Sequence, residues 1–139
     1  MNAGRSEAVR VMSTRLSAPI GNFVHAVEVP SESGLLFLSG MTSRAEDGSV
    51  MHVGDVGAQT RRILLNMQTL LDERGLNLRH VVKVVVYVSD ISDLDAVHAA
   101  RREFFVDAMP ASTLVEVSAF VHPDMCVEID SIAYVPPAA

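Results

Sequence analysis

The stretch MCVEIDSIAYV, Met125 to Val135, decides the fold because its side chains alternate in kind. Successive side chains of a β-strand point to opposite faces, so this stretch predicts a strand with one face suited to burial and one mixed face. The face suited to burial consists of Val127, Ile129, Ser131, Ala133 and Val135. The mixed face consists of Cys126, Glu128, Asp130, Ile132 and Tyr134.

Glu128 is the first candidate for chemistry in this strand. An ionised carboxylate taken out of water costs several kcal/mol unless it is paired, hydrogen-bonded or used in a reaction. The alternative is that Glu128 lies on a wet sheet face and has no special role. Both interpretations follow from the strand pattern, so the surroundings of Glu128 must decide between them.

The preceding run, STLVEVSAFV from Ser112 to Val121, has the same alternation. The connection between the two runs is short and centres on HPD, residues 122–124. We therefore predict an antiparallel hairpin whose two mixed faces lie together. This pairing would bring Ser112, Leu114 and Glu116 into the neighbourhood of Glu128.

The rest of the chain predicts one domain with strands and two helices. Phe23 to Val29 and Leu35 to Thr42 are two short strands joined by the turn formers PSESG, so they predict an opening hairpin. Asp55 can cap a helix that runs to about Arg74, with Gly75 as its terminator. The valine-rich HVVKVVVYV, residues 80–88, predicts another strand, and Ser92 can cap a second helix.

The predicted order is β-β-α-β-α-β-β in an α+β subunit. Residues 17–139 form the single expected domain, and residues 1–16 are expected to be a flexible N-terminal extension. Two helices cover only one face of such a sheet. The second face must therefore be wet, filled or shared with another subunit.

Composition narrows the class of protein. A chain of 139 residues with 49% hydrophobic and 20% charged residues is ordinary for a globular domain. The net charge of -6 argues against nucleic-acid binding. No apolar stretch is long enough to span a bilayer, so we expect a cytoplasmic protein without a membrane partner. The single cysteine excludes a disulfide framework. His52, His80 and His122 lack the spacing of metal ligands, so no metal site is expected. No other cofactor is expected either.

Several ordered segments resemble the Rid family, also called YjgF. The C-terminal signature is PASTLVEV at Pro110 to Val117 followed by VEIDSIA at Val127 to Ala133. The other segments, in order, are APIGNFVHAV at Ala18 to Val27, LLFLSGMT at Leu35 to Thr42, AQTRRILLNMQTLL at Ala58 to Leu71, and VVKVVVYVSDISDLDAVHAARREFF at Val81 to Phe105. The resemblance covers roughly residues 17 to 135 and is specific because several motifs follow one another in the family's order.

This resemblance implies a homotrimer of chorismate-mutase-like α+β subunits, with two helices on one face of each sheet and active sites in the clefts between subunits. The implied reaction is hydrolysis of a reactive enamine or imine, such as 2-aminoacrylate, to a ketoacid and ammonia. Glu128 matches the family glutamate that positions the attacking water. Ser39 and Gly40 match the loop that contributes substrate contacts, where glycine permits close approach of the backbone.

Four positions depart from the family pattern. Ser112 stands where the family's deaminases have an arginine that grips the substrate carboxylate, and serine cannot supply that charged fork. Leu114 replaces a frequent cysteine and Phe23 a frequent tyrosine, and His98 stands where asparagine is common. The expected pocket thus loses charge and polarity, although Glu128 is retained.

Two explanations for an active enzyme remain open. In the first, the anchor for the carboxylate has moved to Arg44, or to Arg101 or Arg102, which follow His98 by three and four residues on the second helix. In the second, the pocket takes a neutral or larger, more apolar imine, enamine or related C–N substrate rather than simple 2-aminoacrylate. The second is our working hypothesis.

Two other classes of function are alternatives to imine or enamine hydrolysis. The chain could be a non-catalytic trimer that binds a small molecule or another protein, which the same substitutions support and the retained Glu128 opposes. Ribonuclease activity has been associated with some relatives, but the acidic balance and the missing arginine argue against it here.

Overall fold

The structure, a computed structural model, describes residues 7–138. Its strands and helices are β1 (Val9–Val11), β2 (Ala26–Glu28), β3 (Gly34–Met41), α1 (Val56–Asp72), β4 (Val81–Val88), α2 (Leu94–Phe104), β5 (Ala111–Glu116) and β6 (Val127–Val135). Short 3-10 turns at Leu78–His80 and Ile91–Asp93 precede β4 and α2. The predicted α+β order is confirmed from β2 onward, and β1 is an additional strand.

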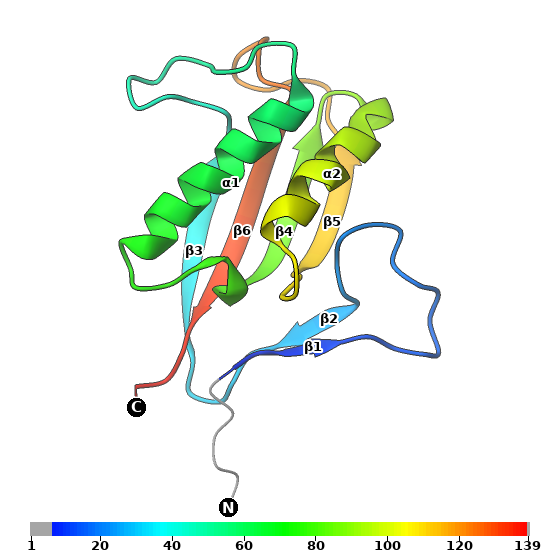
Figure 1. Ribbon diagram of the computed structural model, residues 1–139, viewed down its shortest axis with the longest axis vertical. Helices are drawn as coiled ribbons and strands as arrows, with labels where there is room; N and C mark the ends of the chain where they lie inside the picture. Colours follow the sequence, from blue (N-terminus) through cyan, green and yellow to red (C-terminus); the bar gives the residue numbers. More distant parts are fainter. Residues whose placement is uncertain (1–6, 139) are drawn as a thin grey trace, which may run out of the picture.

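The main sheet has four strands in the order β3-β6-β4-β5, and both helices cover the same face of it (Figure 1). The strand predicted from MCVEIDSIAYV, β6, is central: it runs antiparallel to β3 on one side and to β4 on the other. β5 pairs with β4, and the pairing is parallel. The predicted hairpin of β5 with β6 is therefore wrong, because β4 lies between them.

The parallel register of β5 also corrects which residues share a face. Tyr87 of β4 pairs with Glu128 of β6 and with Val115 of β5, so these three lie in one row. Leu114 pairs with the buried Val86 and packs against the helix-covered core, which places Ser112, Leu114 and Glu116 on the helix side of the sheet. The expected neighbourhood of these three residues with Glu128 is wrong within one chain.

The helix-covered face of the sheet forms the core. Val127, Ile129, Ser131 and Ala133 of β6 are buried there as predicted, whereas Val135 at the strand end is 40% exposed. Ile63, Leu64, Met67 and Leu71 of α1 pack against this face.

The ends of the helices follow local sequence signals for the first helix but not for the second. The Asp55 side chain accepts from Ala58 N at the start of α1, and Gly75 has φ +70° just beyond its end, as predicted. α2 begins after a 3-10 turn that is capped by Asp90, whose carboxylate accepts from Ser92 N. Ser92 therefore does not cap the second helix.

The N-terminal stretch contributes a strand that the sequence did not predict. Val9–Val11 pair antiparallel with Ala26–Glu28, and β3 pairs with β6, so the expected opening hairpin of β2 with β3 is wrong. Ala8 N donates to the Tyr134 hydroxyl at 3.1 Å, and Arg10 donates to two backbone carbonyls. Residues 8–11 of the expected extension thus bond to the rest of the domain, while residues 1–6 lie outside the described part of the chain.

Candidate functional site

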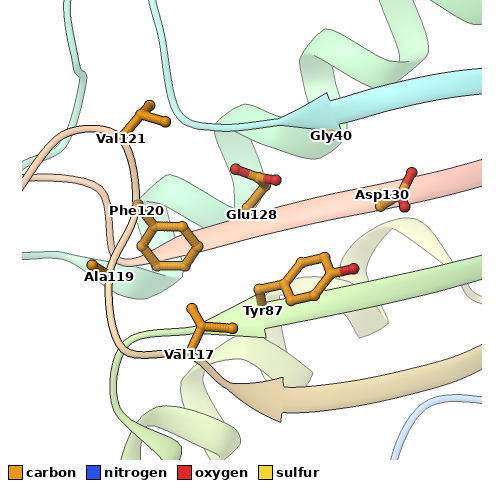
Figure 2. A pocket seen from close by; sticks show the side chains of 8 residues that line it. All are labelled: Gly40, Tyr87, Val117, Ala119, Phe120, Val121, Glu128 and Asp130. Atoms are coloured by element: carbon orange, nitrogen blue, oxygen red, sulfur yellow. The ribbon is translucent and has the colours of Figure 1, made fainter.

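A pocket of about 400 Å³ lies on the open side of the sheet, away from the helices. Its walls come from the central strands, from the end of β3, and from the connection between β5 and β6 (Figure 2). The lining residues are Gly40, Tyr87, Val117, Ala119, Phe120, Val121, Glu128 and Asp130. Glu128 and Gly40, two of the residues predicted for the site, are thus brought together here.

Gly40 and Glu128 lie very close to one another in this pocket. A Cβ built on Gly40 would lie 2.5 Å from Glu128 Oε2 and 3.1 Å from its Cδ, so only glycine leaves room for the carboxylate in the place where it lies here. The cause is a bulge in β3: Leu38 pairs with Ser131 and Met41 with Ile129, which leaves one extra residue in β3. The bulge turns the backbone of Ser39 and Gly40 toward the Glu128 side chain, which is half-buried.

The pocket walls carry negative charge and no positive charge. Glu128 and Asp130 are both carboxylates on the same face of β6, and the lining contains no lysine, arginine or histidine. Across residues 7–138, no side-chain hydrogen bond or ion pair engages the Glu128 carboxylate. A half-buried acid without a partner is available to a ligand or to a water molecule.

An apolar wall faces this carboxylate. In Figure 2 the Phe120 ring lies beside Glu128, with Val117 and Val121 on either side of it along the same connection. Val121 is 93% exposed, so its side chain is not held in place by packing. The pocket therefore combines a carboxylate with an apolar surface wide enough to contact an alkyl or aryl group.

Ser39 and Arg44, two other predicted site residues, do not line this pocket. Ser39 is exposed in the bulge beside Gly40. Arg44 lies in a turn in which it bridges to Val50, and its Nε donates to Gly48 O at 3.1 Å. Its guanidinium is thus turned to its own loop, and the expected placement of Arg44 at the cleft is not found in the single chain.

Phe23 and His98 lie together elsewhere, on the helix side of the sheet. A Cβ built on Gly21 would lie 2.6 Å from His98 Cε1 and 3.2 Å from Phe23 Cε1, so both rings approach the same glycine. Val24 N donates to Pro110 O at 3.1 Å, which holds this segment beside the start of β5. Burial and the nearby Arg101 lower the pKa of His98, so the imidazole is neutral at pH 7.

Arg101 is the buried cation of this second group. It is 1% exposed, its Nη2 donates to Asn22 O at 3.3 Å, and its Nη1 has no hydrogen-bond partner in the part of the chain that the structure describes. Burial lowers the pKa of Arg101 to about 10, so it remains charged at neutral pH. The exposed Arg102 does not share this burial.

The predicted site residues therefore fall into two groups on opposite sides of the sheet. Glu128 and Gly40 line the open-face pocket, whereas Phe23, His98, Ser112 and Leu114 lie on the helix side. A single chain does not join them, because the sheet separates the two groups. The division is the one expected if two chains contribute to one cleft.

Sequence reasoning missed six residues of the pocket: Tyr87, Val117, Ala119, Phe120, Val121 and Asp130. Tyr87 and Asp130 carried a usable signal, because each alternates with buried residues along its strand and so belongs to the open face. Phe120 and Val121 carried none, because their place depends on how the connection after β5 folds back over the sheet.

Two further properties of the described chain bear on ligands. Within residues 7–138, no three His, Cys, Asp or Glu side chains are grouped so that they could hold a metal ion. Neither of the two helices in this part of the chain has the length and apolar character needed to cross a bilayer.

Comparison with known proteins shows the family of this fold. The family described as "Endoribonuclease L-PSP" matches residues 13–135. The 3-aminoacrylate deaminase RutC of Acinetobacter baylyi is 32% identical over 117 residues, covering 84% of this chain and 90% of the relative. A RutC family protein of Pyrococcus abyssi is 31% identical over 124 residues, covering 89% of this chain and 94% of the relative.

Solved structures agree with this assignment. A protein of unknown function of the Rid family, YyfB from Yersinia pestis, superimposes with a TM-score of 0.83 at 26% identity, covering 91% of this chain and 98% of that chain. A member of the YjgF/YER057c/UK114 family from Mycobacterium tuberculosis superimposes with a TM-score of 0.65 at 28% identity, covering 93% and 100%. The predicted resemblance is confirmed, and the chain is a member of the YjgF/Rid family.

Proposed function

We propose that this protein is a Rid-type hydrolase that converts a reactive imine or enamine without a carboxylate beside the reacting carbon into a carbonyl compound and ammonia. The observation that carries the proposal is the Glu128 carboxylate, unpaired among residues 7–138, in a pocket whose lining has an apolar wall and no cation. The relative named 3-aminoacrylate deaminase supports C–N hydrolysis as the reaction class.

Glu128 is suited to act on water because its carboxylate accepts hydrogen bonds and faces the pocket beside Gly40. In the proposed reaction, water adds to the carbon of a protonated C=N bond while Glu128 accepts a proton from that water. The resulting carbinolamine receives this proton on nitrogen. The C–N bond then breaks with its electrons on the departing ammonia, and loss of the hydroxyl proton leaves the carbonyl product.

The charge of the pocket argues for the substrate class. A substrate carboxylate would meet Glu128 and Asp130 with no positive group in the lining, and like charges at close range disfavour binding. A protonated imine carries positive charge and is attracted by the same two groups. The wall formed by Phe120 and Val121 would contact an alkyl or aryl substituent.

We further propose that the active form is a cytoplasmic homotrimer whose subunits share each cleft. The grounds are the two groups of candidate residues on opposite sides of the sheet. In a shared cleft, Phe23, His98, Ser112 and Leu114 of one subunit would face Glu128 and the Ser39–Gly40 bulge of the next. A sedimentation measurement that finds only monomers would contradict this arrangement.

Four imines with matched side chains test the proposal. An amine oxidase acting on ethylamine or phenethylamine generates imines without a carboxylate, and an amino-acid oxidase acting on alanine or phenylalanine generates the corresponding 2-imino acids. We expect this protein to accelerate ammonia release from the amine-derived imines above the spontaneous rate. Hydrolysis of the 2-imino acids, or of 2-aminoacrylate, at a rate that matches an arginine-bearing relative would contradict the proposed substrate class.

Variants of the two acids test the role of Glu128. Glu128→Gln should abolish the acceleration, with a loss of roughly 100-fold or more typical of a general base. The comparison is Asp130→Asn, which neutralises the second acid on the same face of β6 and should raise KM for the protonated imine while leaving kcat largely unchanged. Unchanged rates in Glu128→Gln, together with retained binding of a small molecule, would instead favour a non-catalytic binding trimer.

A further inference from the structure

Gln59 is a buried polar residue of α1 that the proposed reaction does not use. It is 0% exposed and donates to both connections 42–55 and 117–126, which lie at the same end of the sheet (Figure 1). We propose that Gln59 is a positioning residue that holds the apolar wall of the pocket in place and so sets which substrates reach Glu128. The effect on substrate choice rests on the proposed function, but the effect on the wall does not.

The Gln59 amide makes four hydrogen bonds to three residues in two connections, 42–55 and 117–126. Nε2 donates to Asp124 O at 2.8 Å and to His52 O at 3.3 Å. Oε1 accepts from Cys126 N at 3.0 Å and from Cys126 Sγ at 3.1 Å. A primary amide has two donor hydrogens and an acceptor oxygen with two lone pairs, so every hydrogen-bonding position of this side chain is used.

These partners also settle the orientation of the amide. Asp124 O and His52 O are carbonyl oxygens that can only accept, and Cys126 N can only donate. A rotated amide would place its oxygen against two carbonyls and its nitrogen against a backbone N–H. Position 59 therefore requires both a donor and an acceptor, which neither a carboxylate nor an apolar side chain supplies.

The segment that Gln59 holds carries the wall. The connection 117–126 is joined to the sheet at its ends, through Val117 N to Val88 O and through Ser89 N to Cys126 O. Between these ends, the bond from Gln59 to Asp124 O is the hydrogen bond that ties the connection to the rest of residues 7–138. The other hydrogen bonds of Asp124, and those of His122, stay within the connection.

The wall itself has little other support. Ala119, Phe120 and Val121 line the pocket from this connection, and Val121 is almost fully exposed. Cys126, at the end of the same connection, also bonds to Gln59 and lies directly before β6, two residues before Glu128. Loss of the Gln59 bonds would therefore move the wall first, while Glu128 stays paired in the sheet opposite Tyr87.

Gln59→Glu is the sharpest test because it keeps the shape of the side chain but removes both donors. Its carboxylate would face Asp124 O and His52 O, and the connection should shift away. We expect the ratio of kcat/KM for the phenethylamine-derived imine over the ethylamine-derived imine to fall about tenfold, because apolar contacts of a substituent are worth this much or more. The matched control is Gln68→Glu on the same helix, an exposed position whose ratio should not change.

The substrate ratio separates positioning from mere stability. A fold that is only less stable lowers the concentration of active enzyme for both imines equally, so an unchanged ratio in Gln59→Glu would overturn the proposal while leaving the proposed function intact. Gln59→Met, which lacks donors and acceptors, should lower the ratio as well.

Amide hydrogen exchange tests the wall without any substrate. In the wild-type protein, Cys126 N–H should exchange slowly, and residues 119–121 should exchange fast. Gln59→Glu should speed exchange across 117–126 and leave β6 beyond Glu128 unchanged. If the wild type hydrolyses none of the imines, this measurement still decides about Gln59: exchange that is the same in the variant and the wild type would overturn its role. If neither variant folds, rapid exchange of Cys126 N–H in the wild type would overturn the proposed role of Gln59.

Discussion

Gly40 and Glu128 lie so close together that a side chain on Gly40 would overlap the carboxylate: a Cβ on Gly40 would come within 2.5 Å of Glu128 Oε2. Gly40 belongs to the bulge between Leu38 and Met41, and Glu128 to the strand that pairs with it. The Glu128 carboxylate thus lies against the backbone at Gly40, where a side chain would otherwise be. Its position in the pocket depends on the absence of a single methyl group.

Gly40→Ala should therefore impair activity far more than stability. The added methyl meets the far end of the flexible Glu128 side chain, which can swing aside at little cost but then leaves its place beside the bulge. We expect a loss of about 100-fold in kcat/KM, the scale of a 1 Å misplacement, and a change of less than about 1 kcal/mol in the free energy of unfolding.

A second glycine of the same strand supplies the control. The nearest atom to a Cβ on Gly34 is Val135 Cβ at 3.5 Å, an ordinary contact, so Gly34→Ala should keep full activity. Imine hydrolysis and urea denaturation measure the two quantities. Full activity in Gly40→Ala would show that the carboxylate does not act from its place beside the bulge.

Arg101 should depress the basicity of its neighbour on α2. Burial lowers the pKa of His98 most, and the charges of Arg101 and then Arg102 lower it further. Arg101→Met should raise the pKa of His98 because it removes the charge with the larger effect, and Arg102→Met should raise it less. Titration of the imidazole by NMR measures both. An equal or larger rise in Arg102→Met would contradict this order of the two charges.

The lowered pKa of His98 also predicts a pH dependence of stability. A group whose pKa is lower in the folded than in the unfolded state contributes stability above the unfolded value, and that stability is lost as pH falls through the folded value. Unfolding by urea should therefore become easier below the ordinary histidine pKa of 6.5. His98→Asn should weaken this dependence, and an unchanged pH profile would contradict the prediction.

Cys126 should be an unreactive thiol. Burial raises its pKa from 9.0 to about 11, and its Sγ donates to Gln59 Oε1 at 3.1 Å. Because the thiolate is the reactive form, alkylation by iodoacetamide at pH 7 should be about 100-fold slower than in the urea-unfolded chain. The native rate should rise about tenfold per pH unit up to pH 10. A native rate equal to the unfolded rate would contradict the burial.

Arg10 should anchor the N-terminal strand to the domain. Its Nε donates to Met109 O at 3.1 Å and its Nη2 to Arg79 O at 2.6 Å, so one side chain bonds two distant loops. Arg10→Met should lower the free energy of unfolding by about 1–3 kcal/mol, the range for hydrogen bonds from a charged donor. Arg15→Met, at an exposed position of the same stretch, is the control and should change it by less than about 0.5 kcal/mol.

Local signals predicted the elements of this fold well. The alternation along β6 identified the buried face at Val127, Ile129 and Ala133, and the pair of Asp55 and Gly75 marked both ends of α1. Each of these signals depends on a few neighbouring residues whose backbone geometry is set by their own side chains. Glu128 was singled out in the same way, as an acid in a largely apolar strand.

The sequence by itself thus determined the two helices, the strands from β2 onward, the family, and the acid of the candidate site. Only the tertiary structure decided that β5 pairs with β4 in parallel, that Leu114 turns to the helices while Val115 shares a face with Glu128, and that β1 joins the fold. The physical reason is that backbone hydrogen bonds between strands are alike whatever the side chains, so pairing and register are settled by how the whole core packs.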